Sequence, residues 1–93
     1  MSDWHGPHQS AQKSPHDDEI AAVVARGLAE TETFFRDMVE EGRRVGEIAH
    51  RVEPAHTARA LLGLLVGLRV LARSRPERAL LEALADQAAA LLN

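Results

Sequence analysis

Two Glu-x-x-His motifs in the middle of the chain are its first candidates for chemistry. They are Glu47-Ile48-Ala49-His50 and Glu53-Pro54-Ala55-His56. In di-iron helical bundles this spacing binds metal when each motif lies on a different helix, with further glutamates opposite. Here both motifs fall between Gly46 and the helix start predicted at Pro54, so they cannot face each other from two helices. The sequence therefore favours solvated side chains over a metal site at these positions.

Other clusters of titratable side chains lack either the further metal ligands or the apolar pocket that metal binding or acid-base catalysis requires. His5 and His8, with His16 nearby, could bind a transition metal through neutral imidazole, but no ligand of fixed position accompanies them. The acidic runs Asp17-Asp18-Glu19 and Glu40-Glu41 stand at or near helix ends, without an apolar pocket that would raise a carboxyl pKa. We therefore expect no catalytic residue, no cofactor and no metal, and no enzyme activity.

Length and composition indicate one small domain. The chain has 93 residues and no cysteine, which excludes disulfides and thiolate metal sites. Domains of this size bury a modest fraction of their surface and often depend on oligomerisation. Residues 1–13 have neither the apolar core nor the basic start of a signal peptide, so we expect a cytoplasmic protein.

Charge is distributed unevenly along the chain. Residues 17–53 hold ten acids against five arginines, whereas residues 54–93 hold five arginines against three acids. No segment is strongly basic, and nonspecific DNA affinity comes mainly from Lys and Arg that neutralise phosphates. The sequence thus predicts no direct contact between this chain and nucleic acid.

The elements that must position any site are helices. Residues 1–13 are polar and aperiodic and are predicted to be a disordered tail, and residues 14–93 a helical domain. Ser14-Pro15 is typical of a helix start, and Gly46 is a natural helix end. Between them, apolar residues at three-four spacing predict one buried face. They are Ile20, Val24, Leu28, Thr31, Phe35, Met38 and Val45, widened by Val23, Phe34 and Val39.

A second helix is predicted to begin at Pro54, and its apolar arc covers about 200°, twice the width that a one-sided surface helix needs. Its apolar run lies between Arg59 and Arg69 and is too short to cross a bilayer, which needs about 20 residues. One edge of the arc is small (Ala60, Gly63, Gly67) and the other is bulky (Leu61, Leu65, Ala72). We expect the small edge to contact another helix and the bulky edge to form the core, although the reverse assignment stays open. Whether the glycine contact lies within one chain or between two also stays open.

A third helix is predicted from about Arg75 to Leu92, opened by a capping box of Ser74 and Glu77 with Pro76 in its first turn. Its leucines form a core face, and Ala79, Ala83 and Ala90 form a flank of small side chains. The connector at 47–53 is expected to fold back through Ile48, Ala49 and Val52. The predicted fold is all-α, a three-helix antiparallel bundle made of one long helix and a C-terminal helix pair.

The chain from about residue 17 resembles the C-terminal domain of TetR/AcrR-type transcriptional regulators. The resemblance rests on Gly46-Glu47-Ile48, on Glu53-Pro54 followed by Ala58 and Leu61-Leu62, on Gly67-Leu68, on Leu71-Ala72-Arg73 and on the closing leucine-alanine helix. It implies that the last two helices pair with their copies across a twofold axis as a four-helix dimer interface. The candidate interface residues are Ala60, Gly63, Leu64, Gly67, Leu71, Ala79, Ala83, Gln87 and Ala90. The same resemblance makes Phe34, Phe35 and Met38 candidate residues in the wall of a pocket that binds a small hydrophobic effector.

The chain also departs from that family. A full-length member begins with a helix-turn-helix domain of about fifty residues, whose second helix enters the major groove. Too few residues precede the first helix here to form one. Glu53 stands where the family often has aspartate, which should weaken the helix cap. The expected function is therefore homodimerisation, or heterodimerisation with a full-length relative, and effector binding, without DNA or membrane contact. The alternative is a small helical protein-interaction module unrelated to transcription.

Overall fold

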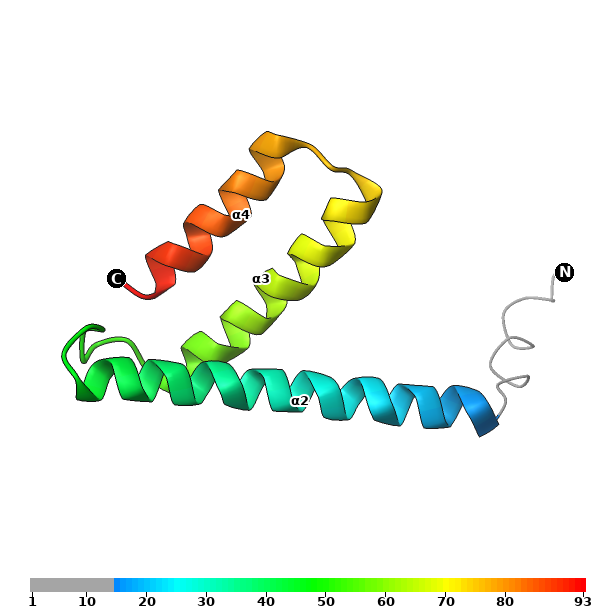
Figure 1. Cartoon of the computed structure of the whole chain (residues 1–93), viewed down its shortest axis with the longest axis horizontal. Helices are drawn as coiled ribbons and strands as arrows, with labels where there is room; N and C mark the ends of the chain where they lie inside the picture. Colours follow the sequence, from blue (N-terminus) through cyan, green and yellow to red (C-terminus); the bar gives the residue numbers. More distant parts are fainter. Residues whose placement is uncertain (1–14) are drawn as a thin grey trace, which may run out of the picture.

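The computed structural model describes residues 15–93 as three helices, and no strand occurs in this range. The helices are α2 (Pro15–Arg44), α3 (Pro54–Ser74) and α4 (Arg78–Leu91). Successive helices reverse direction, and α3 packs against both α2 and α4 (Figure 1). The predicted all-α three-helix bundle is confirmed. The disordered tail predicted at 1–13 lies outside the described residues.

Helix α2 ends where glycine was predicted to stop it. Gly46 adopts a φ of +83°, which L side chains rarely adopt. The N–H of Gly46 donates to the Arg43 carbonyl at 3.2 Å, and that of Glu47 donates to the Gly42 carbonyl at 2.8 Å. These two bonds form a Schellman motif, which satisfies carbonyls that the helix end would leave unpaired.

The connector between α2 and α3 folds back onto the end of α2. The side chain of Ile48 lies so close to Gly42 that a Cβ atom added there would stand 2.5 Å from the Ile48 Cδ1. The Arg43 Nη2 donates to the carbonyl of His50 at 2.8 Å. Val52 is buried and Ile48 half-buried, as expected, but Ala49 is exposed.

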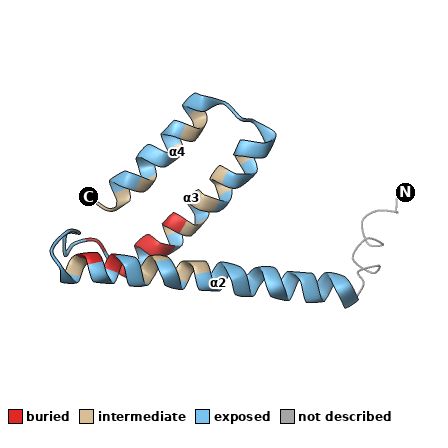
Figure 2. Ribbon diagram, viewed as in Figure 1, coloured by how far each residue is buried: buried red, intermediate tan, exposed pale blue. Residues whose placement is uncertain are grey.

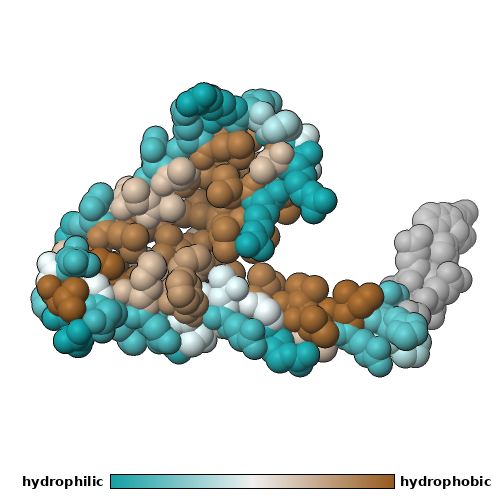
Figure 3. All heavy atoms as spheres, viewed as in Figure 1, coloured by the Kyte–Doolittle hydropathy of each residue, from teal (hydrophilic) through white to brown (hydrophobic). Residues whose placement is uncertain are grey.

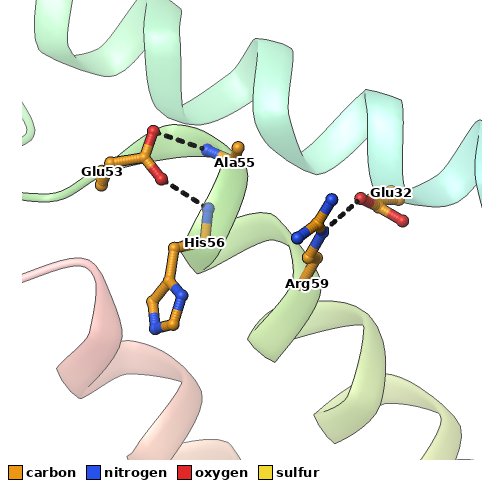
Figure 4. A network of polar contacts seen from close by, with 5 residues as sticks. All are labelled: Glu32, Glu53, Ala55, His56 and Arg59. Carbon is orange, nitrogen blue, oxygen red and sulfur yellow. Dashed lines mark hydrogen bonds and ion pairs between the residues drawn. The ribbon is translucent and has the colours of Figure 1, made fainter.

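Glu53 caps the start of α3 with both oxygens of its carboxylate. Oε1 accepts the N–H of His56 at 2.8 Å, and Oε2 accepts that of Ala55 at 3.2 Å (Figure 4). These hydrogen bonds, that from His56 first, hold the pKa of Glu53 below its ordinary value of 4.5. We expected a weakened cap at this position, and the structure has instead a cap in which both oxygens are engaged. Pro54, as predicted, is the first residue of the helix.

Helix α4 begins later than predicted. Ser74 is the last residue of α3, so it does not cap α4, and Pro76 lies in the three-residue link at 75–77. The Glu77 carboxylate accepts from the Arg75 Nη2 at 3.0 Å and makes no cap hydrogen bond to α4. The predicted capping box is therefore wrong, because its glutamate pairs with the arginine between the two helices.

The buried core is small and lies where the end of α2 meets the start of α3 (Figure 2). Its buried side chains are Val39, Val52, Thr57, Ala58 and Leu61. Phe35 of α2 and Ile48 of the connector pack on it, as do Ala88 and Leu91 of α4 and Leu92 just after that helix. In α2 only Val39 and Gly42 are buried, and every residue from 15 to 30 is exposed. The predicted buried face is thus wrong for the first half of α2, because this helix of about 45 Å extends beyond the helices that pack on it.

Candidate docking surfaces

An apolar groove lies between the three helices. Its volume is about 160 Å³, and all its lining side chains are apolar: Phe35 from α2, Leu61, Leu64, Leu65 and Leu68 from α3, and Leu84, Ala85 and Ala88 from α4. Pockets that orient drug-sized ligands are larger, about 300–1,000 Å³, and contain a few placed polar groups. This groove offers apolar contact only, so it can hold a hydrophobic group but cannot orient a polar substrate.

The three candidate pocket residues of α2 lie in different places. Phe35 lines the groove, whereas Phe34 is 64% exposed and Met38 lies on the surface at 37% exposed. The two phenylalanine rings pack edge to face, with centroids 5.8 Å apart. Of these three residues the structure therefore brings Phe35 alone to the groove, and four leucines of α3 form half of its lining.

A surface of small and β-branched residues runs along the outside of α3. We call it the glycine face and define it as Gly63, Val66, Gly67 and Val70. The spacing i, i+3, i+4, i+7 places these residues on one side of the helix. Val66 and Val70 are 40% and 55% exposed. The sequence reasoning named the two glycines but missed the valines, which the same spacing could have found.

The glycines of this face make no close contact within the chain. A Cβ atom added at Gly63 or at Gly67 would meet no atom within 4 Å outside the adjoining helix backbone. The leucine edge of α3, by contrast, faces the core and the groove through Leu61 and Leu65. Of the bulky edge, Leu61 is thus in the core and Leu65 lines the groove, whereas Ala72 is exposed, and the described residues offer no close packing partner that explains the glycines. Each glycine costs about 1 kcal/mol in a helix relative to alanine.

The remaining candidate interface residues lie partly in the groove and partly outside it. Leu64 lines the groove, and Ala60 and Leu71 are half-buried on α3. On α4 the candidates are all exposed, at the spacing i, i+4, i+8, i+11 of one helix edge: Ala79, Ala83, Gln87 and Ala90. No residue of α4 is fully buried. Helix α4 therefore has an open edge of mostly small side chains.

A third apolar surface lies on the first half of α2. We call it the α2 stripe and define it as Ile20, Val23, Val24 and Leu28, whose exposed fractions lie between 39% and 60%. Hydrophobic atoms gather in the angle between α2 and the α3 and α4 pair, and continue along this half of α2 (Figure 3). These side chains were predicted to be core, and the structure leaves them uncovered.

The titratable side chains have structural roles. Glu53 caps α3, and Glu41 accepts from Arg44 at 2.5 Å, which lowers the pKa of Glu41 and raises that of Arg44. Glu32 pairs with Arg59 at 3.3 Å (Figure 4). Within residues 15–93, no three His, Cys, Asp or Glu side chains are grouped so that they could hold a metal ion. His5 and His8 lie outside the described residues.

Helix α3 is also the one described helix that is long and apolar enough to cross a membrane by length and composition. Only 17% of its most apolar window is buried inside the chain. Arg59 and Arg69 interrupt the helix at both ends of its uncharged run, and Arg59 pairs with Glu32 of α2. Much of the apolar surface of α3 is thus not buried by the other described helices, and a functional proposal must account for this exposed surface.

Comparisons with protein-family models, with curated proteins and with solved structures found no match for this chain.

Proposed function

We propose that this chain is a self-association module of the kind found in the C-terminal domains of TetR/AcrR regulators. Two copies pair through α3 and α4 to form a four-helix interface. The observation that carries the proposal is the glycine face, because Gly63 is exposed and Gly67 half-buried, yet an added Cβ atom at either would meet no close neighbour within the chain. Glycines in a helix interior weaken it, so their presence here is explained by a second helix that approaches closely.

The open edge of α4 supports the same pairing. Ala79, Ala83 and Ala90 are exposed and present no charge, so a helix from another copy can lie against them. Small domains with too little core often gain stability by oligomerising. The core here contains one fully buried large side chain, that of Val39. Pairing would cover part of the apolar surface that α3 leaves open.

The module acts in the cytoplasm and does not contact DNA itself. Residues 15–93 contain no strongly basic helix, and α2 is acidic. In a cell that also holds a full-length relative, mixed dimers would carry one DNA-reading half in place of two and would compete with operator binding. The apolar groove beside Phe35 provides a place for a small hydrophobic effector.

A second function is favoured by one specific observation, the exposed α2 stripe. Four exposed apolar side chains on a helix half that neither α3 nor α4 covers are typical of a surface that binds another protein. A small helical interaction module would use this surface to bind a partner rather than a copy of itself.

The test of self-association is the Gly63→Leu variant, with Gly67→Leu as its repeat. A Cβ atom at either position has open space around it, so we expect the monomer to tolerate the substitution, whereas a close helix pair should not. Gly27→Leu is the matched control, since Gly27 is also an exposed helical glycine with nothing within 4 Å. We expect sedimentation velocity to show dimers for the unchanged chain and for Gly27→Leu, and monomers for the other two variants. Dimers that persist in both α3 variants would exclude the glycine face as the interface.

A further inference from the structure

The α2 stripe has the shape of a docking site for one helix. Ile20, Val23, Val24 and Leu28 follow the spacing i, i+3, i+4, i+8, so they form a continuous ridge along one side of α2. A shallow hollow of about 300 Å³ lies on this side and is lined by Glu19, Ile20, Val23 and Val24. No residue of α2 before Thr31 is even half-buried, so the ridge is accessible over its whole length.

Acidic side chains border this ridge. At 100° per residue, Glu19, Glu30 and Asp37 lie along one border, with Arg26 among them, and Glu32, which already pairs with Arg59, lies along the other. Over residues 15–35 the chain holds five acids and one arginine. The surface thus combines an apolar centre with negative borders.

We propose that the α2 stripe binds a basic amphipathic helix of another protein chain. In such a complex the apolar face of the partner lies on Ile20, Val23 and Val24, while Lys or Arg residues beside that face pair with the acidic borders. Docking an amphipathic helix through anchors at i, i+3, i+4 and i+7 is a common mode of peptide recognition. Charge complementarity sets the choice of partner, because like charges across an interface are strongly unfavourable.

The same acidic borders also disfavour two other binding partners of the α2 stripe, a second copy of the chain and an anionic membrane. A second copy that docked through its own α2 stripe would bring two sets of acidic borders together. An anionic membrane surface would be repelled, since membrane-surface helices carry Lys and Arg beside their apolar face. The inference does not depend on the pairing of α3 and α4, because the glycine face lies on α3 and shares no residue with the stripe.

The experiment compares two synthetic helical peptides of about 18 residues. Both have the same leucine face, and the borders of that face are lysine in one and glutamate in the other. Each labelled peptide is titrated with the full chain, and fluorescence anisotropy reports binding. We expect saturable one-to-one binding of the lysine peptide that weakens as salt rises, and at least about tenfold weaker binding of the glutamate peptide.

Variants of the chain assign the binding to the stripe. The double substitution Ile20→Ser with Val24→Ser should weaken the binding of the lysine peptide by about tenfold or more, because it removes two apolar anchors. Val45→Ser is the matched control, since Val45 is 48% exposed but lies just beyond the end of α2, away from both the stripe and the glycine face. The double substitution Glu19→Lys with Glu30→Lys should reverse the preference toward the glutamate peptide. Circular dichroism of each variant shows whether α2 remains helical, and a variant that loses helicity is replaced by Val23→Ser alone.

Several results would overturn the proposal. They are equal binding of the two peptides, no binding of either, equal weakening by Val45→Ser, or no effect of the stripe variants. Sedimentation velocity of the Ile20→Ser, Val24→Ser variant separates this inference from self-association. If that variant dimerises as the unchanged chain does, the stripe is not the dimer interface. If it becomes monomeric, the stripe binds a second copy and the proposed partner is wrong.

Discussion

The Nε atom of Arg59 on α3 lies 3.3 Å from the Oε2 atom of Glu32 on α2, and this ion pair marks where the packing of α2 ends. Toward the C-terminus, Phe35 and Val39 pack into the core. Toward the N-terminus, every residue from 15 to 30 is exposed. The exposed Arg59 side chain makes the pair weak, so the pair indicates the boundary without holding the helices together.

Hydrogen exchange should reveal this boundary directly. We expect the backbone amides of residues 19–30 to exchange much faster than those of residues 35–44, because the first half of α2 has no tertiary cover. Mass spectrometry of peptic fragments measures both segments in one experiment. Equal protection of the two halves in the isolated chain would mean that something covers the α2 stripe.

Gly42 should not tolerate a side chain. Its added Cβ would stand 2.5 Å from Cδ1, 2.7 Å from Cγ1 and 3.3 Å from Cβ of Ile48. The Gly42→Ala variant should therefore lower the free energy of unfolding by about 1–3 kcal/mol, as overpacking does. Gly27→Ala is the control. It should raise the free energy of unfolding by up to about 1 kcal/mol, since a Cβ atom added at Gly27 would meet no atom within 4 Å. Urea denaturation followed by circular dichroism measures both, and a neutral Gly42→Ala would show that Ile48 moves aside freely.

Glu53 should make the stability of the chain depend on pH in the acid range. The backbone N–H groups of His56 and Ala55 hold its pKa below the ordinary 4.5, so the folded state binds this proton less tightly than the unfolded state. The stabilisation is fully present above pH 4.5 and is lost as the pH falls through the lowered pKa. Thermal melts of the unchanged chain and of Glu53→Gln should differ most at neutral pH and converge in acid. A constant difference at all pH values would show that the charge of the cap does not contribute.

The apolar α3 should associate with protein in preference to lipid. Because Arg59 and Arg69 bracket its uncharged run and α2 and α4 pack on it, we expect the chain to stay in the supernatant when neutral phosphatidylcholine vesicles are sedimented. Sedimentation of most of the chain with the vesicles would favour a membrane role for α3 instead.

Helix positions were predictable from local chemistry. Pro15, Gly46 and Pro54 each fix a helix end through φ restriction or a positive φ, and all three ends are where the sequence predicts them. The capping box at Ser74 was predicted wrongly, because this motif is recognised from only four residues, Ser74 to Glu77, without regard to the preceding helix. The choice between Ser74 and Arg78 as a helix boundary depends on how long α3 continues.

The surfaces were less predictable, since periodicity shows which side of a helix is apolar but not what covers it. Ile20, Val24 and Phe35 follow one stripe in the sequence, yet only Phe35 reaches the groove. The length of α2 relative to α3 decides this outcome, and that relation appears only in three dimensions. The sequence likewise predicted a close helix contact at the glycines of α3. Only the structure shows that, apart from their chain neighbours, no side chain of the described residues lies within 4 Å of a Cβ atom added at these glycines.

Sedimentation equilibrium of the unchanged chain at micromolar concentrations tests the self-association on which the proposed pairing of α3 and α4 depends. We expect a mass twice the 10.2 kDa of one chain, shifting toward the single mass on dilution. A well-folded chain that keeps the mass of one copy throughout this concentration range would contradict it.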